Sequence, residues 1–354
     1  MAVDFFKKFI NDLGEPDTAV ASDGVSPAEF SGFIDTGSYI LNAAVSGSLF
    51  RGIPNNKAVV LAGESTTGKT FFALGIVKNF LDTHKNARVF YFDTEAAVTK
   101  SMLSDRGIDP TKVSISAPHH IQGFRNTASK LIDQYDALAP KDKFPALLVL
   151  DSLSMLPSRK EVEDIKEESD KKDMTKPGEI KGAFRILRLK MAKSGIPMIV
   201  TNHVYANIGG YGNQKVVAGG SGAVYASDTI VMLSKRQEKD GDERIGNIVH
   251  ARMKKSRLSR EETQVDTRIL YNGGLDRYYG LLPYAIAAGL VTKGATKYEF
   301  PDGTKVFEKA LNRTPEKYFT QEFLEKLDPY IQTQFQYTSN EPVVEDENEE
   351  NEEE

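Results

Sequence analysis

One eight-residue motif constrains the fold of this chain more than any other feature. The motif is GESTTGKT at residues 63–70, and it matches the pattern G-x-x-x-x-G-K-[ST]. An apolar run at 57–62 precedes it, and the helix-like run TFFALGIVKNFL follows it. In such a loop, backbone N–H groups and the amino terminus of the next helix hold phosphate oxygens. The motif therefore predicts a strand, a phosphate-binding loop and a helix, the building unit of an α/β fold.

The residues of this loop have distinct expected roles in binding a nucleoside triphosphate. Lys69 would reach the β and γ phosphates, and the hydroxyl of Thr70 would bind Mg²⁺. The other loop residues would hold phosphate oxygens, mainly through their backbone N–H groups. The nucleotide-binding candidates in the loop are Gly63, Glu64, Ser65, Thr66, Thr67, Gly68, Lys69 and Thr70.

Further apolar runs, separated by amphipathic stretches, are typical of strands buried on both faces of a parallel sheet. These runs are 88–93, 146–151, 196–201 and 228–233. Two alternating segments, 246–254 and 263–271, predict an antiparallel hairpin. After residue 280, a helix-like run, a hairpin with a Pro-Asp-Gly turn and an amphipathic run at 321–331 predict a small α+β lobe.

Carboxylates stand at the ends of two predicted strands. Asp151 ends the run ALLVLD, where an acid can hold Mg²⁺ through water beside the phosphate loop. Glu95 follows the run RVFYFD, where a carboxylate can deprotonate the water that attacks the γ-phosphate. We therefore expect Glu95 to be the general base. The alternative is that Asp93 or Glu95 only caps a following helix.

Polar and cationic residues follow two later strands. Asn202 and His203 come after the fourth strand, where a side chain can contact the γ-phosphate and report its loss to the glycine-rich segment that follows. A single histidine is more often a hydrogen-bonded structural residue. The run RMKKSR at 252–257 could be a solvated hairpin end, a contact with phosphate backbone, or a donor to the nucleotide of a neighbouring subunit.

These motifs together resemble those of the RecA-type recombinases, and the match looks closest to the bacteriophage UvsX branch. After the phosphate loop, FDTE, LLVLDSLSML, VTNHVY, AGGSG, MKKSR and ILYNGGLDRYYG occur in the order and spacing of that family. The resemblance covers about residues 33–282. It implies a DNA-dependent ATPase that binds ATP and Mg²⁺, forms helical filaments on single-stranded DNA, and exchanges strands with homologous double-stranded DNA. A single-strand-binding protein and a recombinase-loading mediator are the further partners it implies.

The resemblance also implies roles for individual residues. It places the catalytic glutamate at Glu95, the magnesium-side aspartate at Asp151 and the sensor of the γ-phosphate at His203. The two cations that reach across to the ATP of a neighbouring subunit fall on Lys255 and Arg257. Together with Lys69, these residues form the expected catalytic set.

Two long connections become the DNA-binding loops under this resemblance. They are the charged segment at about 157–182 and the segment at about 204–224, which has six glycines. Backbone N–H groups can bind phosphates, and apolar or aromatic side chains can wedge or stack against bases. The candidates for DNA binding are Arg159, Lys160, Val204, Tyr205, Ile208, Gly209, Gly210, Tyr211, Lys215, Gly219, Gly220 and Gly222. A plain flexible loop is the alternative.

Two features match the family less closely. The tyrosine that stacks on adenine in the family is replaced by Met102, whose thioether packs on a base with less defined geometry. The amino-terminal arm docks on the next subunit in the family, and Phe5, Phe6, Phe9 and Ile10 are the candidates for that contact. An amphipathic helix folded back on its own domain is an equal alternative.

The formal net charge of −5 conceals two unlike parts of the chain. The last fourteen residues contain nine acids and no base, so the rest of the chain carries +4. We expect a disordered tail that competes with DNA phosphates for a cationic surface or only increases solubility. The absence of cysteine excludes disulfides and thiol chemistry. No apolar run is long enough for a membrane helix, so we expect a soluble, cytoplasmic protein, in a bacterial host cell if it is phage-encoded.

We therefore expect four parts in this chain. They are an oligomerisation arm at 1–32, a RecA-like ATPase core at 33–278, a small lobe at 279–336 and a disordered acidic tail at 337–354. A hexameric replicative helicase shares such a core but would need a sizeable amino-terminal domain. A catalytically weak mediator paralogue is the other alternative, against which the intact Lys69, Glu95 and Asp151 argue.

Overall fold

The computed structural model describes residues 2–15, 18, 20–21, 32–167, 173–206, 215–218, 222 and 227–337. Its α-helices are α1 (Ala2–Asp12), α2 (Tyr39–Ser46), α3 (Lys69–Thr83), α4 (Lys100–Ser104), α5 (Ile121–Asp136), α6 (Arg159–Lys166), α7 (Lys176–Ser194), α9 (Leu282–Ala287), α10 (Glu308–Arg313) and α11 (Gln321–Phe335). Short 3₁₀ helices are η2 (Pro110–Lys112), η3 (Pro140–Asp142), η4 (Leu153–Met155) and η5 (Pro315–Lys317).

One large sheet forms the centre of the molecule. Its strands are β3 (Ala58–Gly63), β4 (Arg88–Asp93), β5 (Val113–Ser116), β6 (Ala146–Asp151), β7 (Met198–Ala206), β8 (Lys215–Val217), β9 (Thr229–Asp240), β10 (Glu243–Lys255), β11 (Gln264–Leu270) and β12 (Gly274–Leu275). Two smaller sheets contain β1 (Phe33–Ile34) with β2 (Ile53–Pro54), and β13 (Thr292–Lys293) with β14 (Tyr298–Glu299) and β15 (Lys305–Val306).

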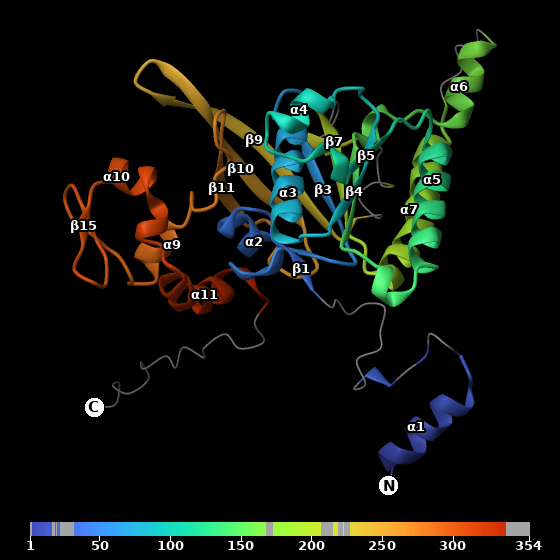
Figure 1. The fold of residues 1–354 in the computed structure, drawn as a ribbon, viewed down its shortest axis with the longest axis horizontal. Coiled ribbons are helices and arrows are strands. Elements are labelled where there is room, and N and C mark those ends of the chain that lie inside the picture. Colours follow the sequence, from blue (N-terminus) through green and yellow to red (C-terminus); the bar gives the residue numbers. More distant parts are fainter. Residues whose placement is uncertain are drawn as a thin grey trace, which may run out of the picture.

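The order of the strands confirms the predicted fold class. In space they lie in the order β12, β11, β10, β9, β3, β7, β6, β4 and β5, with β8 paired to β7 (Figure 1). The strands from β9 to β5 in this order are parallel, and those from β9 to β12 alternate in direction. The fold is α/β, with a mostly parallel sheet flanked by helices, and the predicted hairpin of β10 and β11 is present.

Alternating side chains of the strands fill two apolar clusters, one on each face of the sheet. Val59 and Leu61 of β3 lie in the cluster that includes α2 and α3. Val60, between them, lies in the other cluster, which includes α5 and α7. α5 and α7 run side by side along that face (Figure 1). Because both faces are covered, the strands are apolar almost throughout, as their sequence indicated.

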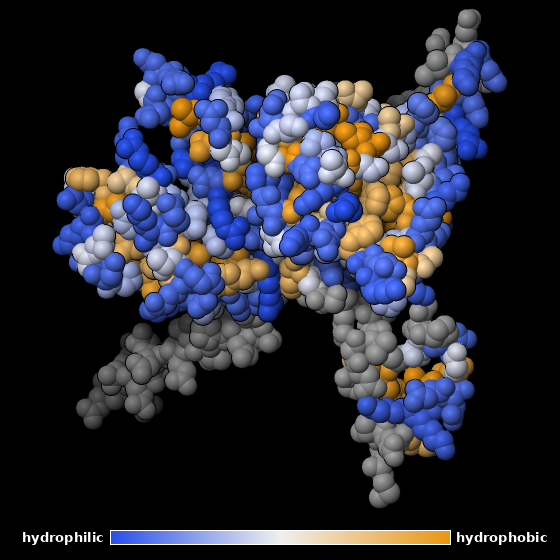
Figure 2. Space-filling model, viewed as in Figure 1, coloured by the Kyte–Doolittle hydropathy of each residue, from blue (hydrophilic) through white to orange (hydrophobic). Residues whose placement is uncertain are grey.

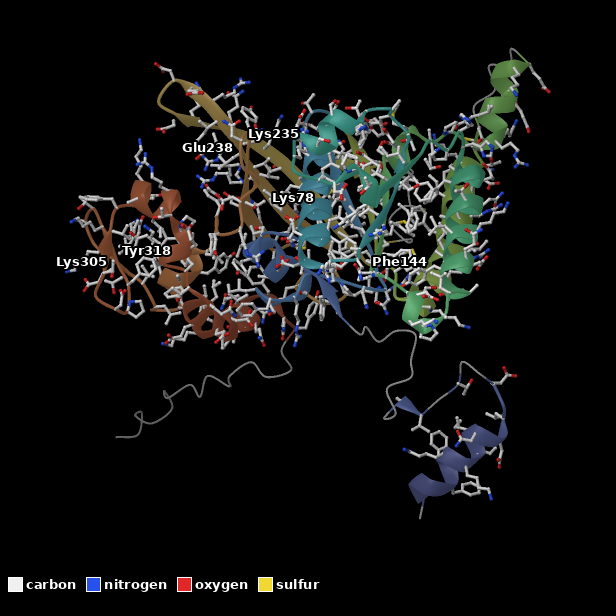
Figure 3. All side chains as sticks on the ribbon, in the orientation of Figure 1. Lys78, Phe144, Lys235, Glu238, Lys305 and Tyr318 are labelled. Carbon is white, nitrogen blue, oxygen red and sulfur yellow. The ribbon has the colours of Figure 1, made fainter. Side chains whose placement is uncertain are left out.

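The sequence predicted the bounds of the apolar central strands more accurately than those of the polar strand segments. β4 and β6 have the predicted bounds. β9, however, continues seven residues beyond the predicted end at 233, to Asp240. This polar extension pairs with β10 in a ribbon that projects from the sheet and carries Lys235 and Glu238 (Figure 3). β5 was not predicted, because it is a short, half-exposed edge strand with no apolar run.

The two long connections are more ordered than the sequence suggested. The first, 157–182, contains α6 and the start of α7, so its interpretation as a loop was wrong for these residues. Within this charged helix, Lys160 pairs with Asp164 one turn away, which adds a small stabilisation. In the second connection, β7 continues to Ala206 and pairs antiparallel with β8, from Val204 opposite Val217 to Ala206 opposite Lys215.

The carboxyl-terminal lobe contains the predicted helix, hairpin and amphipathic helix, as α9, the β14–β15 pair and α11. Its apolar side chains belong to the same cluster as α2 and α3. The carboxylate of Asp328 in α11 accepts hydrogen bonds from the Ser48 hydroxyl (3.0 Å) and the Leu49 N–H (2.6 Å). The lobe is therefore packed on the core, and a domain boundary after residue 278 remains a prediction.

The amino-terminal helix has an exposed apolar face. Phe5, Phe6 and Phe9 of α1 are exposed, and apolar atoms gather on this helix in Figure 2. Contact of this face with a second copy remains a prediction. The acidic tail beyond Tyr337 lies outside the described residues. In the described part of the chain, no helix combines the length and apolar character needed to cross a membrane.

Candidate nucleotide-binding site

The loop between β3 and α3 has the geometry of a phosphate cradle. Thr66 and Gly68 have positive φ angles of 67° and 89°, and these angles produce the tight turn of the loop between β3 and α3. A Cβ atom on Gly63 would lie 2.8 Å from Thr67 Oγ1 and 2.9 Å from the Leu233 carbonyl oxygen. Glycine is therefore required at Gly63 by close packing, and the sequence pattern reflects this.

The amino terminus of α3 is suited to an anion. Gly68 is the N-cap residue, and no side chain caps the first turn of this 15-residue helix. Uncapped N–H groups and the helix dipole together attract phosphate. The Lys69 ammonium donates hydrogen bonds to the carbonyls of Gly63 (3.1 Å) and Glu64 (2.9 Å), and Thr70 is half-buried in the first turn. Burial lowers the pKa of Lys69, and Glu95 and Asp151 oppose this change.

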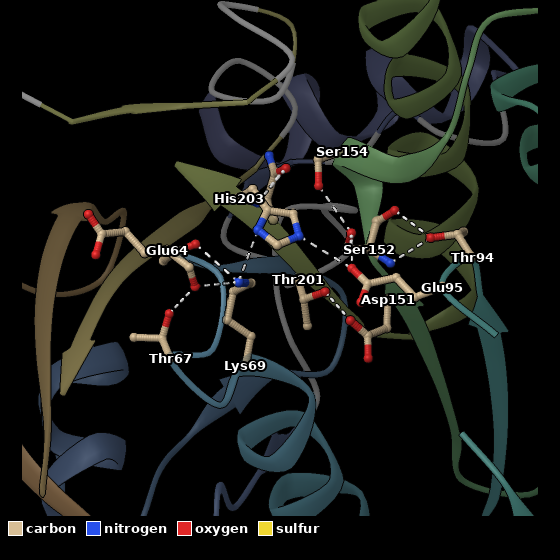
Figure 4. Close-up of polar contacts among 12 residues, drawn as sticks. Glu64, Thr67, Lys69, Thr94, Glu95, Asp151, Ser152, Ser154, Thr201 and His203 are labelled. Carbon is tan, nitrogen blue, oxygen red and sulfur yellow. Dashed lines mark hydrogen bonds and ion pairs between the residues drawn. The ribbon is translucent and has the colours of Figure 1, made fainter. Parts of the chain in front are cut away.

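The carboxyl ends of β3, β7, β6 and β4 meet at one edge of the sheet. Gly63 lies opposite His203, and Asp93 lies opposite Asp151. As Figure 4 shows, His203 lies between the phosphate loop and Glu95. Its Nδ1 is 3.4 Å from the Lys69 Nζ, and its Nε2 is 3.3 Å from the Glu95 Oε1. Since lysine can only donate, this arrangement fits the tautomer protonated at Nε2.

Glu95 and Asp93 have different environments, although they are two residues apart. The Asp93 carboxylate is buried and accepts hydrogen bonds from the N–H groups of Glu95 (3.1 Å) and Val98 (2.9 Å). It holds the turn after β4. The Glu95 side chain instead accepts a hydrogen bond from the Ser152 hydroxyl (2.9 Å) and reaches His203. Capping of the turn thus belongs to Asp93, which leaves Glu95 beside the phosphate loop.

Two buried hydroxyl groups donate hydrogen bonds to the Asp151 carboxylate. The Tyr91 hydroxyl donates to Asp151 Oδ2 (2.7 Å). The Thr201 hydroxyl donates to Asp151 Oδ1, as Figure 4 shows. Burial, followed by the charge of Asp151, raises the pKa of Tyr91 well above its usual value, so this phenol remains a donor. Sequence reasoning missed Tyr91, Thr201 and Ser152. The signal available was a polar residue inside, or directly after, an otherwise apolar run.

The residues present fit Mg²⁺ bound together with phosphates. Thr70 and Asp151 offer hard oxygen donors, which Mg²⁺ prefers, and this ion usually keeps several waters. Both Asp151 oxygens already accept hydroxyl hydrogen bonds, which fits contact through water. Within the described residues, no cluster of three or more His, Cys, Asp or Glu side chains could hold a metal alone. Phosphate oxygens and waters are the other ligands that Mg²⁺ usually takes.

A cavity of about 690 Å³ lies beside α3. Its lining includes Phe71, Arg106 and Tyr271. The Arg106 guanidinium lies 4.2 Å from the centre of the Phe71 ring and donates to the Met102 carbonyl (2.9 Å). The Met102 side chain is half-buried against the apolar cluster of α3. Contact of Met102 with a nucleotide base remains a prediction.

The structure does not bring Lys255 and Arg257 to the phosphate loop of their own chain. Asp228 donates its N–H to the Ala58 carbonyl (3.0 Å), at the amino end of β3. Arg257 Nε lies 3.3 Å from Asp228 Oδ1, and Lys255 Nζ donates to the Ser227 carbonyl (2.8 Å). From Ala58 to Gly63, β3 advances by about 16 Å. The two cations therefore lie at the opposite edge of the sheet from the phosphate loop.

The described DNA-binding candidates lie in three different environments. Arg159 and Lys160 are exposed at the start of α6. Tyr205 is 60% exposed, whereas the adjacent Val204 is buried in the apolar cluster of α5 and α7 and so presents no surface to a base. A Cβ on Gly222 would lie 2.6 Å from the Pro177 carbonyl, so packing against α7 explains this glycine.

The remaining candidates lie at or beyond the limits of the described chain. Lys215 is the first residue of β8 rather than part of a loop. The base of this ribbon is connected to the phosphate edge, because the Asn202 amide donates to the Ala218 carbonyl (2.9 Å) and Ala218 N–H donates to the His203 carbonyl (2.8 Å). The candidates outside the described residues are Ile208, Gly209, Gly210, Tyr211, Gly219 and Gly220.

Comparison with known proteins finds similarity over most of this chain. The family described as the RecA N-terminal domain matches residues 18–276. The Recombination and repair protein of Enterobacteria phage T4 is 32% identical over 254 residues, which are 72% of this chain and 63% of the phage protein, less than two thirds of its length. Protein RecA of Malacoplasma penetrans is 26% identical over 75% of this chain and 77% of its own. A crystal structure of the RadB recombinase superimposes with a TM-score of 0.50 at 20% identity, over 69% of this chain and 99% of that one.

Proposed function

The chain belongs to the RecA family, and from this premise we propose that it is an ATP-dependent recombinase that assembles on single-stranded DNA and exchanges strands with homologous double-stranded DNA. The single observation that carries the proposal is the division of its catalytic groups between two opposite edges of one sheet. The phosphate loop and Glu95 lie at one edge, and Lys255 and Arg257 lie at the other. A complete site then requires two copies of the chain.

The phosphate edge supplies binding and water activation in this proposal. The loop and Lys69 would hold the phosphates, and Thr70 and Asp151 would hold Mg²⁺, which would supply charge neutralisation at the phosphates when bound. His203 lies between Lys69 and Glu95 and contacts both side chains. Glu95 accepts a proton from the attacking water. Ser152 orients the Glu95 carboxylate from the other side. His203 contacts both groups, so it is placed to respond to the presence of the γ-phosphate.

The opposite edge supplies charge to a neighbouring copy. In a head-to-tail assembly, each subunit presents Lys255 and Arg257 to the nucleotide held by the next one. Such cations stabilise the charge that develops on the phosphates during hydrolysis. Hydrolysis removes the group that they bind and loosens the contact between subunits. An open helical filament follows when the rotation between copies does not close a ring.

DNA contact would occur through the ribbon of β7 and β8 and the start of α6. Tyr205 is the described aromatic side chain exposed on this ribbon and can stack on a base. Asn202 and Ala218 connect the base of the ribbon to His203, so nucleotide state and DNA contact share one strand. A single-strand-binding protein and a loading mediator complete the set of proposed partners.

Two measurements test this function. ATP hydrolysis should increase at least several-fold when single-stranded DNA is added, and strand exchange between a single strand and its homologous duplex should require ATP. The Lys69→Ala variant is the negative control. Hydrolysis that ignores DNA would favour the mediator alternative, and closed six-membered rings that unwind duplex DNA would favour the helicase alternative.

A further inference from the structure

The cation-bearing edge of the sheet contains one buried carboxylate that the proposed mechanism does not use. Asp228 is only 2% exposed and lies just before β9, beside the first residue of β3. Its backbone is fixed there by the hydrogen bond to the Ala58 carbonyl, and its Oδ2 accepts the Ala58 N–H (3.2 Å). The position of this carboxylate is thus determined by the central sheet itself.

The other carboxylate oxygen holds two arginines. Asp228 Oδ1 accepts a hydrogen bond from Arg188 Nη2 of α7 (2.6 Å) and lies 3.3 Å from Arg257 Nε. Lys57 and Lys255 lie near enough to interact with the same group electrostatically. Asp228 therefore lies among four cations, and Glu261 is a further acid near Lys255.

The atom through which Arg257 contacts Asp228 determines which parts of its guanidinium remain available to a nucleotide. The contact uses Nε, on the stem side of the guanidinium, so it does not occupy the two terminal Nη groups. The Arg257 side chain is 54% exposed, whereas Asp228 is buried. A buried carboxylate 3.3 Å from Nε attracts the guanidinium and restricts the rotation of this long side chain, while its outer fork remains able to bind a phosphate. Arg188 supplies the charge that allows the carboxylate to remain buried.

We propose that Asp228 is a positioning residue that holds Arg257 in the orientation required by the phosphates of a nucleotide bound to the neighbouring copy of the chain. This inference rests on the proposed function, because it assumes that Arg257 acts between subunits. Asp228 itself touches no nucleotide. Its contribution is to reduce the number of conformations of Arg257 before the neighbour arrives.

The first test is a double-mutant cycle on ATP hydrolysis in the presence of single-stranded DNA. Asp228→Asn keeps the shape of the side chain and should lower kcat about tenfold, with a smaller change in KM for ATP. Arg257→Ala should lower kcat about 10³-fold. In the Arg257→Ala background, Asp228→Asn should have no further effect, because the group that it positions is absent. Equal losses in both backgrounds would overturn the proposal.

The second test separates positioning of Arg257 from a defect in folding or in the phosphate loop. Asp228→Asn chains have an intact phosphate loop, and Lys69→Ala chains have an intact cation edge. Mixed on single-stranded DNA, the two should hydrolyse ATP several-fold faster than the sum of the separate variants, because Lys69→Ala neighbours donate a positioned Arg257. A rate equal to that sum would overturn the proposal, because it would show that Asp228 affects hydrolysis of the nucleotide bound to its own subunit.

Controls distinguish failure of this inference from failure of the proposed function. If a mixture of Arg257→Ala with Lys69→Ala also gives no recovery, Arg257 does not act between subunits and the proposed function fails. If that mixture recovers and the Asp228→Asn mixture does not, only the role of Asp228 fails. Asp240→Asn, at the exposed end of β9, should behave as wild type.

A further variant tests the proposal even if Asp228→Asn does not fold. Arg257→Lys keeps the positive charge but has no Nε to meet Asp228, so it should lose about tenfold in kcat. Lys69→Ala neighbours should restore this loss. Full activity of Arg257→Lys would overturn the proposal.

Discussion

The two edges of the central sheet differ in how they are built and in what they can do alone. At the phosphate edge, Lys69, Glu95, Asp151 and His203 come from four adjacent strands or the turns after them. His203 contacts both Lys69 and Glu95, and Tyr91 and Thr201 hold Asp151 beside them. At the opposite edge, cations gather around one buried carboxylate, Asp228. The first edge can bind a nucleotide within one chain. Under the proposed function, the cations of the second edge would act on the nucleotide of another copy.

The difference follows from strand direction. Parallel strands bring their carboxyl ends to one edge, where turns and helix amino termini collect. β10 runs antiparallel to β9, so its end carries Lys255 toward the amino ends of the parallel strands. A single antiparallel addition thus places the phosphate loop and the Lys255–Arg257 cations on opposite sides of one chain, as the proposed head-to-tail assembly would require.

The largest expected effect is on ATP affinity, which should depend on Lys69 at one edge and not on Arg257 at the other. In dilute chains without DNA, Lys69→Ala should weaken ATP binding about 100-fold, because the buried ammonium that meets the phosphates is lost. Arg257→Ala should leave this affinity unchanged, because its edge does not contact the nucleotide of the same chain. Titration with a fluorescent ATP analogue measures both. A comparable loss in the two variants would contradict the separation of the edges.

Similar in size is the loss of water activation at the phosphate edge. Glu95→Gln retains the hydrogen-bonding shape beside Ser152 and His203 but cannot accept a proton. We expect kcat for ATP hydrolysis to fall by about 10²-fold, with ATP binding retained. Single-turnover measurements would check this, with Glu322→Gln on the exposed face of α11 as the control. A loss of less than tenfold would show that a group other than Glu95 is the general base.

A smaller effect concerns the support of the magnesium-side carboxylate. Tyr91→Phe removes one of the two hydroxyls that hold Asp151, a loss of about 1 kcal/mol in a buried hydrogen bond. The Mg²⁺ concentration for half-maximal hydrolysis should rise about three- to tenfold. Tyr135→Phe, which removes a similar phenol hydrogen bond far from this edge, is the matched control. An unchanged Mg²⁺ requirement would assign Tyr91 to packing alone.

The smallest expected effect is the pH dependence of Lys69. Burial lowers its pKa below 10.5 in the folded chain, so between the folded and unfolded values the unfolded chain binds more protons. The contribution of Lys69 to stability therefore rises with pH in that interval. Between pH 8 and pH 10, the melting temperature of wild type should rise by about 1–2 °C relative to Lys69→Met. Lys78→Met, at an exposed position of the same helix, is the matched control.

The sequence predicted some strands better than others, for a physical reason. β4 and β6 are covered on both faces, so burial makes them continuously apolar and their ends are visible in the composition. The outer half of β9 is exposed and held by pairing with β10, which leaves no apolar pattern. The resemblance to the RecA family, stated from the order of motifs, is confirmed by the match over residues 18–276.

The sequence by itself determined the phosphate edge. The loop is a local motif, and the residues after apolar strands must meet wherever parallel strands end, so Lys69, Glu95, Asp151 and His203 could be placed together in advance. Only the tertiary structure decided what supports these residues. Tyr91 and Thr201 meet Asp151, and Arg188 and Arg257 meet Asp228, through contacts between segments far apart in the chain. Such contacts depend on the packing of whole elements, which no local pattern of residues specifies.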